Sequence, residues 1–217
     1  MLITIFGDVH GNLIALEKLF ELENSKTDIF VCHGDVLNYG PWSNECVQYL
    51  AGIPNCSILK GNHENYFTNG FYEGQNVIAK AFFEFCYSKF DKSLLNTIED
   101  YQNQIRIEGF TIQHTIYDQY IFADTDISKI EIDTNYIIGH SHQQFVREKN
   151  EFKIYNTGSL GQNRQYINQS CYLKLDTTTK NIELKSFVHD ISKVINQMKS
   201  EKYPAICIDY YLSKKQA

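Results

Sequence analysis

The N-terminal stretch MLITIFGDVHGN, residues 1–12, joins an apolar run to two residue types that bind metals. Its apolar part, Leu2–Phe6, is typical of a buried β-strand. Asp8 and His10 follow directly, and we expect the backbone to turn there because Gly7 and Gly11 supply conformational freedom. The stretch therefore predicts a strand whose carboxyl end carries a carboxylate and an imidazole.

Three more loops follow predicted strands and carry the same residue types. They read Gly34-Asp35, Gly61-Asn62-His63-Glu64 and Gly139-His140-Ser141-His142. Asp8, Asp35 and Asn62 are spaced equally, 27 residues apart, which is the length of one strand–helix repeat. Such repeats place their loops side by side at the C-terminal edge of a parallel sheet, where α/β folds bind ligands. His114 follows the predicted strand Phe110–Gln113 and can reach the same edge.

The ligand types at this edge indicate the kind of metal. Imidazole, carboxylate and amide groups converge there, and no thiolate is among them. Such mixed sites suit Mn, Fe, Zn, Co or Ni better than Mg or Ca. A single D-x-H or G-D carries little information, so the prediction of a transition-metal site depends on all the loops occurring together.

The remaining pattern predicts an α/β protein with one domain, residues 1–217. Strands and helices alternate in the first half, whereas the second half is mainly strands and hairpins. We expect two facing mixed β-sheets flanked by helices, a four-layer αββα sandwich. A helical, aromatic-rich insert at about residues 66–103 is either a lid over the site or a helix packed on a sheet face. The last predicted helix, about Ile191–Ser200, leads to a short tail.

Composition narrows the possible functions. The chain has a net charge of −6 and only three arginines, so it lacks the clustered basic residues of a general nucleic-acid binder. None of the six cysteines forms a C-x-x-C pair. No apolar run is long enough for a signal sequence or a membrane span. We therefore expect a cytoplasmic protein with reduced thiols.

The loop residues resemble the calcineurin-like metallophosphoesterase superfamily. The pattern of that family is D-x-H, then G-D, then G-N-H-[DE], then a separate His, then G-H-x-H, and all five parts are present. The stretches GDVHGNLIALE, GDVLNYGPWSNECV, GHSHQQF and NTGSLGQNR are similar to the small single-domain prokaryotic branch. The resemblance covers nearly the whole chain.

The resemblance implies hydrolysis of phosphate esters by a hydroxide that bridges two divalent transition-metal ions. It assigns one metal to Asp8, His10 and His142. It assigns the other metal to Asn62, His114 and His140. It also implies two catalytic residues, Asp35 as the bridge between the metals and His63 as a general acid or transition-state stabiliser that faces the phosphate.

Three polar residues outside the ligand set are candidates for substrate binding: Asn12, Asn38 and Arg164. Asn38 is either a partner that orients His63 through its side-chain oxygen or an ordinary turn residue. Arg164 is either a phosphate clamp or a surface arginine. Trp42 either stacks on a nucleobase or belongs to the core. His114 precedes a threonine where the family usually has glycine.

Three functions are compatible with this pattern. The leading hypothesis is a phosphodiesterase or phosphatase that acts on nucleotide-like or other small phosphoesters, as a monomer or a homo-oligomer. A phosphoprotein phosphatase is the second, although Asn38 and Tyr39 replace the Asp-Arg pair of that branch. The third is a catalytically silent scaffold on the same fold, which the intact His63 disfavours.

Overall fold

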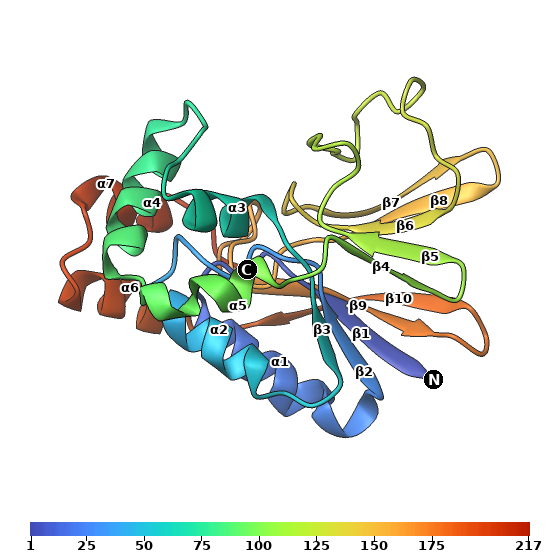
Figure 1. Ribbon diagram of the computed structural model, residues 1–217, viewed down its shortest axis with the longest axis horizontal. Coiled ribbons are helices and arrows are strands. Elements are labelled where there is room, and N and C mark those ends of the chain that lie inside the picture. Colours follow the sequence, from blue (N-terminus) through green and yellow to red (C-terminus); the bar gives the residue numbers. More distant parts are fainter.

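The computed structural model describes residues 1–217 and contains two mixed five-stranded sheets (Figure 1). The first sheet has the order β10-β9-β1-β2-β3 and consists of β1 (Leu2–Phe6), β2 (Ile29–Cys32), β3 (Cys56–Ile58), β9 (Gln169–Asp176) and β10 (Asn181–Val188). The second has the order β4-β5-β6-β8-β7 and consists of β4 (Gln104–Ile107), β5 (Phe110–Gln113), β6 (Asn135–Ile138), β7 (Gln144–Lys149) and β8 (Phe152–Thr157).

Each sheet combines two parallel strand pairings with two antiparallel ones. β1 pairs in parallel with β2, and β2 with β3, while β9 and β10 add antiparallel strands at the other edge. In the second sheet β6 lies parallel to both β5 and β8, and β4 and β7 are antiparallel edges. The carboxyl ends of β1, β2 and β3 therefore share one edge, as the equal spacing of the loops predicts.

The two faces of β1 bury different parts of the core. Ile3 and Ile5 point toward the second sheet and pack with Ile112 and Ile137, which closes the space between the sheets. Phe6 lies in a larger cluster on the other face, where the helices cover the first sheet. Alternate residues of a strand point to opposite faces, so this one strand holds both layers together.

Helices flank the sheets, and the predicted fold class of two facing mixed sheets flanked by helices is confirmed. They are α1 (Leu13–Glu23), α2 (Ser43–Ala51), α3 (Asn62–Asn69), α4 (Val77–Lys89), α5 (Leu95–Glu99), α6 (Ile191–Ser200) and α7 (Ala205–Leu212), with short 3₁₀ turns at Asn24–Lys26 and Lys92–Leu94. In Figure 1, α4, α6 and α7 gather beyond one end of the strands. None of these helices combines the length and the apolar character needed to cross a membrane.

The outer layer of the second sheet differs from the expected αββα arrangement. Residues 114–134 form no helix or strand, yet they cover this face with buried isoleucines that pack on β6, β7 and β8: Ile116, Ile121, Ile127, Ile130 and Ile132. Two cations on β7 hold the segment, because Arg147 and Lys149 donate hydrogen bonds to its backbone carbonyls. The fourth layer is therefore an irregular segment, and its buried isoleucines have no regular spacing that would signal a helix.

The C-terminal tail is also different from the prediction, because it contains the helix α7. Tyr211 of α7 is 1 % exposed and packs with Phe82 of α4. Its sequence, AICIDYYL, is rich in β-branched and aromatic residues, which weakens a helix signal. Burial against α4 stabilises this helix despite its low intrinsic propensity.

Candidate metal centre

The predicted ligands come together where strands of both sheets end. Asp8 and His10 follow β1, Asp35 follows β2, and Asn62 begins α3 shortly after β3. From the second sheet, His114 follows β5, and His140 and His142 follow β6. The structure thus gathers all seven predicted ligand residues at one end of the sandwich.

One cluster contains Asp8, His10 and His142. The Nε2 atoms of His10 and His142 lie 3.0 Å apart. The buried Oδ1 of Asp8 lies 3.8 Å from Nε2 of His10 and 3.5 Å from Nε2 of His142, and it has no hydrogen-bond partner. A buried carboxylate oxygen without a partner is costly, so this trio fits a cation at its centre.

The second cluster surrounds Nε2 of His114. This atom lies 3.1 Å from Oδ1 of Asn62, 3.1 Å from Nδ1 of His140 and 3.2 Å from Oδ2 of Asp35. The substitution of threonine for the usual glycine after His114 does not displace its ring from the cluster. Carboxylate, amide and imidazole groups form a set of the type that divalent transition metals prefer.

Asp35 lies between the clusters. Its Oδ2 is 3.2 Å from Nε2 of His114 in one cluster and 3.8 Å from Nε2 of His10 in the other. Its Oδ1 accepts a hydrogen bond of 2.9 Å from the backbone N–H of His63, which fixes the plane of the carboxylate. Oδ2 of Asp35 is therefore near imidazoles of both clusters.

The ligand residues themselves adopt the unusual backbone conformations that direct their side chains toward the clusters. Asp8, His10, Asp35, His140 and His142 all have positive φ angles, between 47° and 67°. Non-glycine residues in this region each cost about 1–3 kcal/mol, and such residues cluster at functional sites. The predicted role of Gly7 in the turn is wrong, because its φ angle is not positive and a Cβ atom there would meet the ring of His33 at 2.2 Å.

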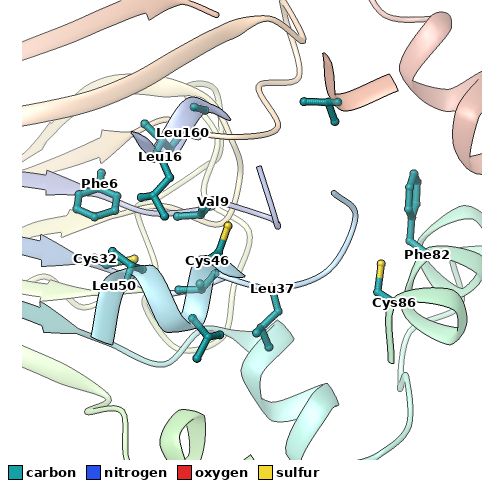
Figure 2. Close-up of a cluster of buried hydrophobic side chains, with 14 of the residues drawn as sticks. Phe6, Val9, Leu16, Cys32, Leu37, Cys46, Leu50, Phe82, Cys86 and Leu160 are labelled. Atoms are coloured by element: carbon teal, nitrogen blue, oxygen red, sulfur yellow. The ribbon is translucent and has the colours of Figure 1, made fainter. Parts of the chain in front are cut away.

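Apolar residues between the ligands hold these loops in place. Val9 lies between Asp8 and His10, and Leu37 lies two residues after Asp35; both are fully buried in the main core cluster. Figure 2 shows Val9, Leu37 and Leu160 pointing into this cluster from separate loops. Packing of the intervening side chains provides the free energy that offsets the strained ligand conformations.

Backbone carbonyls orient three of the histidine rings. The Nδ1 atoms of His10, His114 and His142 lie 3.2, 3.2 and 2.7 Å from the carbonyl oxygens of Leu37, His33 and Gln162, respectively. A proton on each Nδ1 donates to its carbonyl, which leaves Nε2 free to bind a metal.

Burial and charge shift the pKa values of these side chains in different directions. Burial lowers the pKa of His10 and of His140 to about 3, so both rings are neutral at pH 7. Burial, reinforced by the nearby Asp35 carboxylate, raises the pKa of Asp8 to about 8. Burial would lower the pKa of His114, but the neighbouring Asp35 carboxylate outweighs burial and raises that pKa to about 9. Asp8 therefore lacks a sufficient counter-charge in the protein alone, and a divalent cation would supply it.

His63 lies beside the clusters, in the first turn of α3 instead of in the predicted loop. Its Nε2 is 3.9 Å from Oδ2 of Asp35. Nδ2 of Asn38 lies 2.9 Å from Nδ1 of His63, so the amide nitrogen, not the predicted oxygen, faces the ring. Because this nitrogen can only donate, Nδ1 accepts and the ring proton is on Nε2, toward the clusters.

The other two candidates for substrate binding have different surroundings. Asn12 is fully buried; its Oδ1 caps α1 at the N–H of Ala15, and its Nδ2 donates to the carbonyl of Gly161. These contacts do not support the prediction that Asn12 binds substrate. Arg164 is exposed, and its guanidinium lies 5.6 Å from the ring centroid of Tyr120, which itself stacks on His140 at 3.8 Å.

Two residues of the site were not among the predicted functional residues, Glu64 and Tyr120. Glu64 is fully buried and accepts hydrogen bonds from the backbone N–H groups of Asp35, Val36 and Gly61, so it ties two ligand loops together. Its place in the G-N-H-E motif is the signal for this role. Tyr120 lies in the irregular segment, and no motif distinguishes it from the other tyrosines.

Trp42, a candidate for stacking on a nucleobase, is half-buried and packs against the main core cluster.

The chain belongs to the calcineurin-like phosphoesterase family, whose sequence profile matches residues 1–165. It is 28% identical to the uncharacterized protein MJ0912 of Methanocaldococcus jannaschii, over 94% of each chain. Its fold is similar to that of a metallophosphoesterase from Sphaerobacter thermophilus, with a TM-score of 0.79, 20% identity and 98% of both chains covered. It is also similar to the hypothetical protein PH1004 from Pyrococcus horikoshii, with a TM-score of 0.81 and 15% identity over 100% of this chain and 99% of the other.

Proposed function

We propose that the protein hydrolyses small, nucleotide-like phosphoesters with two divalent transition-metal ions. The observation that carries this proposal is the position of Asp35 Oδ2, which lies between two clusters of imidazole and oxygen ligands. Asp8, His10 and His142 would hold one ion, and Asn62, His114 and His140 the other. When bound, two such ions lower the pKa of a water molecule and neutralise charge on the phosphoryl oxygens.

Two residues outside the ligand set, His63 and Arg164, would interact with the phosphate. His63 carries its proton on Nε2, which places a donor beside the clusters for a phosphoryl oxygen or the leaving group. Arg164 is near enough to lower the pKa of His140 and His142, after the larger effect of burial, so its charge acts on the same region. An arginine there binds phosphate by charge-assisted hydrogen bonds.

A phosphoprotein phosphatase is less well supported. The arginine of that branch is replaced by Tyr39, whose half-buried ring packs edge-on against His10 at 4.9 Å and against Phe82 at 4.7 Å. Tyr39 therefore provides no cation for a phosphoryl group. A silent scaffold is also less well supported, because a protein that only binds partners has no need of His63 or of strained ligand conformations.

The state of the cysteines indicates the compartment in which the protein works. All six cysteines are free, and five of them are buried. Free thiols persist in reducing compartments, so we infer that the protein works in the cytoplasm.

Metal removal is the direct test of the proposal. We expect protein from metal-supplemented growth to contain about two transition-metal ions per chain. Chelation should abolish hydrolysis of bis-p-nitrophenyl phosphate, and Mn²⁺ should restore it. Metal content by mass spectrometry and turnover by absorbance measure both parts. Full turnover in metal-free protein would contradict the proposal.

Arg164→Ala tests the phosphate clamp. We expect kcat/KM to fall about 10- to 100-fold on both monoesters and diesters, because a charge-assisted hydrogen bond contributes about 1.5–3 kcal/mol. Metal content should not change. The control is Arg106→Ala, which removes an exposed arginine from β4, outside the centre. Equal kinetics in the two variants would mean that Arg164 is only a surface arginine.

A further inference from the structure

Five tyrosines from five different segments lie around the metal centre. We call them the tyrosine rim: Tyr39 after β2, Tyr66 in α3, Tyr72 between α3 and α4, Tyr120 in the 114–134 segment, and Tyr210 in α7. In Figure 1, α3 and its connection to α4 lie on one side of the strand ends, and the 114–134 segment lies on the other. Three of these segments also carry metal ligands, whereas the α3–α4 connection and α7 contribute to the rim alone.

Ring contacts connect the rim to both sides of the centre. The ring of Tyr120 stacks on His140, with centroids 3.8 Å apart and planes at 29°. The rings of Tyr39 and Tyr66 each lie 5.4 Å from that of His63. Tyr72 lies 5.0 Å from Tyr66, and Tyr210 lies 6.5 Å from Tyr39.

Two cations lie over rings of the rim. Arg164 lies 5.6 Å from the ring centroid of Tyr120, the tyrosine that stacks on His140, whereas Lys214 lies 4.3 Å from the ring centroid of Tyr210 in α7. Lys60, which precedes the Asn62 loop, instead donates to the carbonyl of Glu99 at 2.8 Å. Polyphosphates and phosphopeptides are bound by clusters of cations, so a region with one arginine fits a ligand with one phosphate.

A polar hollow extends the same region past Arg164. It has a volume of about 580 Å³, begins at His142, and is lined by amide side chains that include Gln143, Gln165 and Gln169. Its size falls in the range of ordinary small-molecule sites, about 300–1,000 Å³. Amide groups both donate and accept hydrogen bonds, as the edges of a nucleobase and the hydroxyls of a sugar require.

We propose that the tyrosine rim, Arg164 and the adjoining hollow bind a nucleoside that is esterified to a single phosphate. This inference rests on the proposed function and deepens it by assigning the organic part of the substrate. Aromatic side chains bind bases by stacking without selecting strongly among them, so the rim favours nucleosides as a class. The single arginine then binds the one phosphate, beside the metals.

The test compares two diesters that share a leaving group. Thymidine 5′-p-nitrophenyl phosphate and methyl p-nitrophenyl phosphate differ only in a nucleoside or a methyl group. In both, water adds to phosphorus, the bond to the nitrophenyl oxygen breaks, and p-nitrophenolate leaves with the electron pair. With the Mn²⁺-loaded protein, we expect kcat/KM to be at least about tenfold higher for the nucleoside ester, because stacking on one ring has roughly that effect.

Variants connect this preference to the rim. Tyr72→Leu and Tyr120→Leu should each lower kcat/KM for the nucleoside ester about tenfold more than for the methyl ester, and Tyr120→Phe should keep most of the preference because it keeps the ring. The matched control is Tyr117→Leu, at a tyrosine that is 61% exposed and outside the rim. Metal content, measured in each variant, separates loss of recognition from damage to the centre.

The outcomes are distinguishable. Equal kcat/KM for the two esters, or a preference that survives in both leucine variants with metal retained, would overturn this inference and leave the proposed function standing. A higher kcat/KM for diadenosine tetraphosphate than for the nucleoside ester would overturn the assignment of a single phosphate. Hydrolysis of no ester by the metal-loaded protein would overturn both proposals together.

Discussion

Asp35→Asn should lower turnover by about a thousandfold or more and weaken the binding of both metal ions. The change keeps the shape of the side chain, and its oxygen can still accept from the N–H of His63. The amide nitrogen, however, would take the place of Oδ2, the atom that lies 3.2 Å from His114 and 3.8 Å from His10. Loss of a bridge that holds both ions removes several kcal/mol of transition-state stabilisation, and each 1.36 kcal/mol is about tenfold in rate.

The comparison with Asp8→Asn makes this prediction specific. Oδ1 of Asp8 lies near the rings of His10 and His142 only, and its Oδ2 accepts from the backbone N–H of His140, so its asparagine variant should lose mainly one ion, whereas Asp35→Asn should lose both. Asp124→Asn, at an exposed position of the 114–134 segment, controls for the change of charge. Metal analysis and circular dichroism measure binding and folding independently of rate. Wild-type turnover in Asp35→Asn would show that the loop assignment is wrong.

The sequence pattern predicted the position of the ligands better than their conformation. Asp8, Asp35 and Asn62 repeat at equal spacing because each follows one strand of a parallel sheet, and that regularity is visible without a structure. Positive φ angles at Asp8 and His10 were not predictable in the same way. They depend on the burial of Val9 between them, which is a tertiary effect.

Irregular and aromatic segments account for most of the differences in the fold. The 114–134 segment lacks the 3.6-residue or two-residue apolar period that identifies a helix or a strand, so its contribution to the outer layer depends on contacts with the second sheet. The helix α7 has few strong helix formers and depends on packing against α4. Both segments supply residues of the tyrosine rim, Tyr120 and Tyr210, which is why sequence patterns did not identify it.

Asn12 shows that a motif residue beside the ligands can also have a structural role. It occurs in the H-G-N stretch beside the ligands, which suggested a contact with phosphate. In the structure its side chain caps α1. Its amide nitrogen donates to the carbonyl of Gly161 and lies within hydrogen-bond distance of the ring of His189. The residue therefore fixes the start of the helix that follows the first ligand loop, and this role is common for asparagine at an N-cap.

His63→Ala should retain both metal ions and the fold but lose turnover about 10²- to 10⁴-fold on substrates with a poor alkoxide leaving group, the range typical of general acid catalysis. Distances alone do not decide whether His63 is a metal ligand or a proton donor. Candidate ligand atoms of His63, His10 and Asp35 all lie within 4.8 Å of one another, as a metal site would require. The contact with Asn38 distinguishes the roles, since it leaves the proton on Nε2. A protonated nitrogen donates to an oxygen and would have to lose its proton before it could bind a metal.

Leaving groups and histidine controls separate the two roles of His63. The loss should be smaller for p-nitrophenolate, which departs with little need of a proton, than for an alkyl alcohol. His140→Ala and His142→Ala should instead lose metal, and their defects should not depend on the leaving group. If His63→Ala lost metal as these two do, His63 would be a ligand. If its defect were the same for good and poor leaving groups, with metal retained, His63 would act only by stabilising charge on the phosphoryl oxygens, and the general-acid role would be wrong.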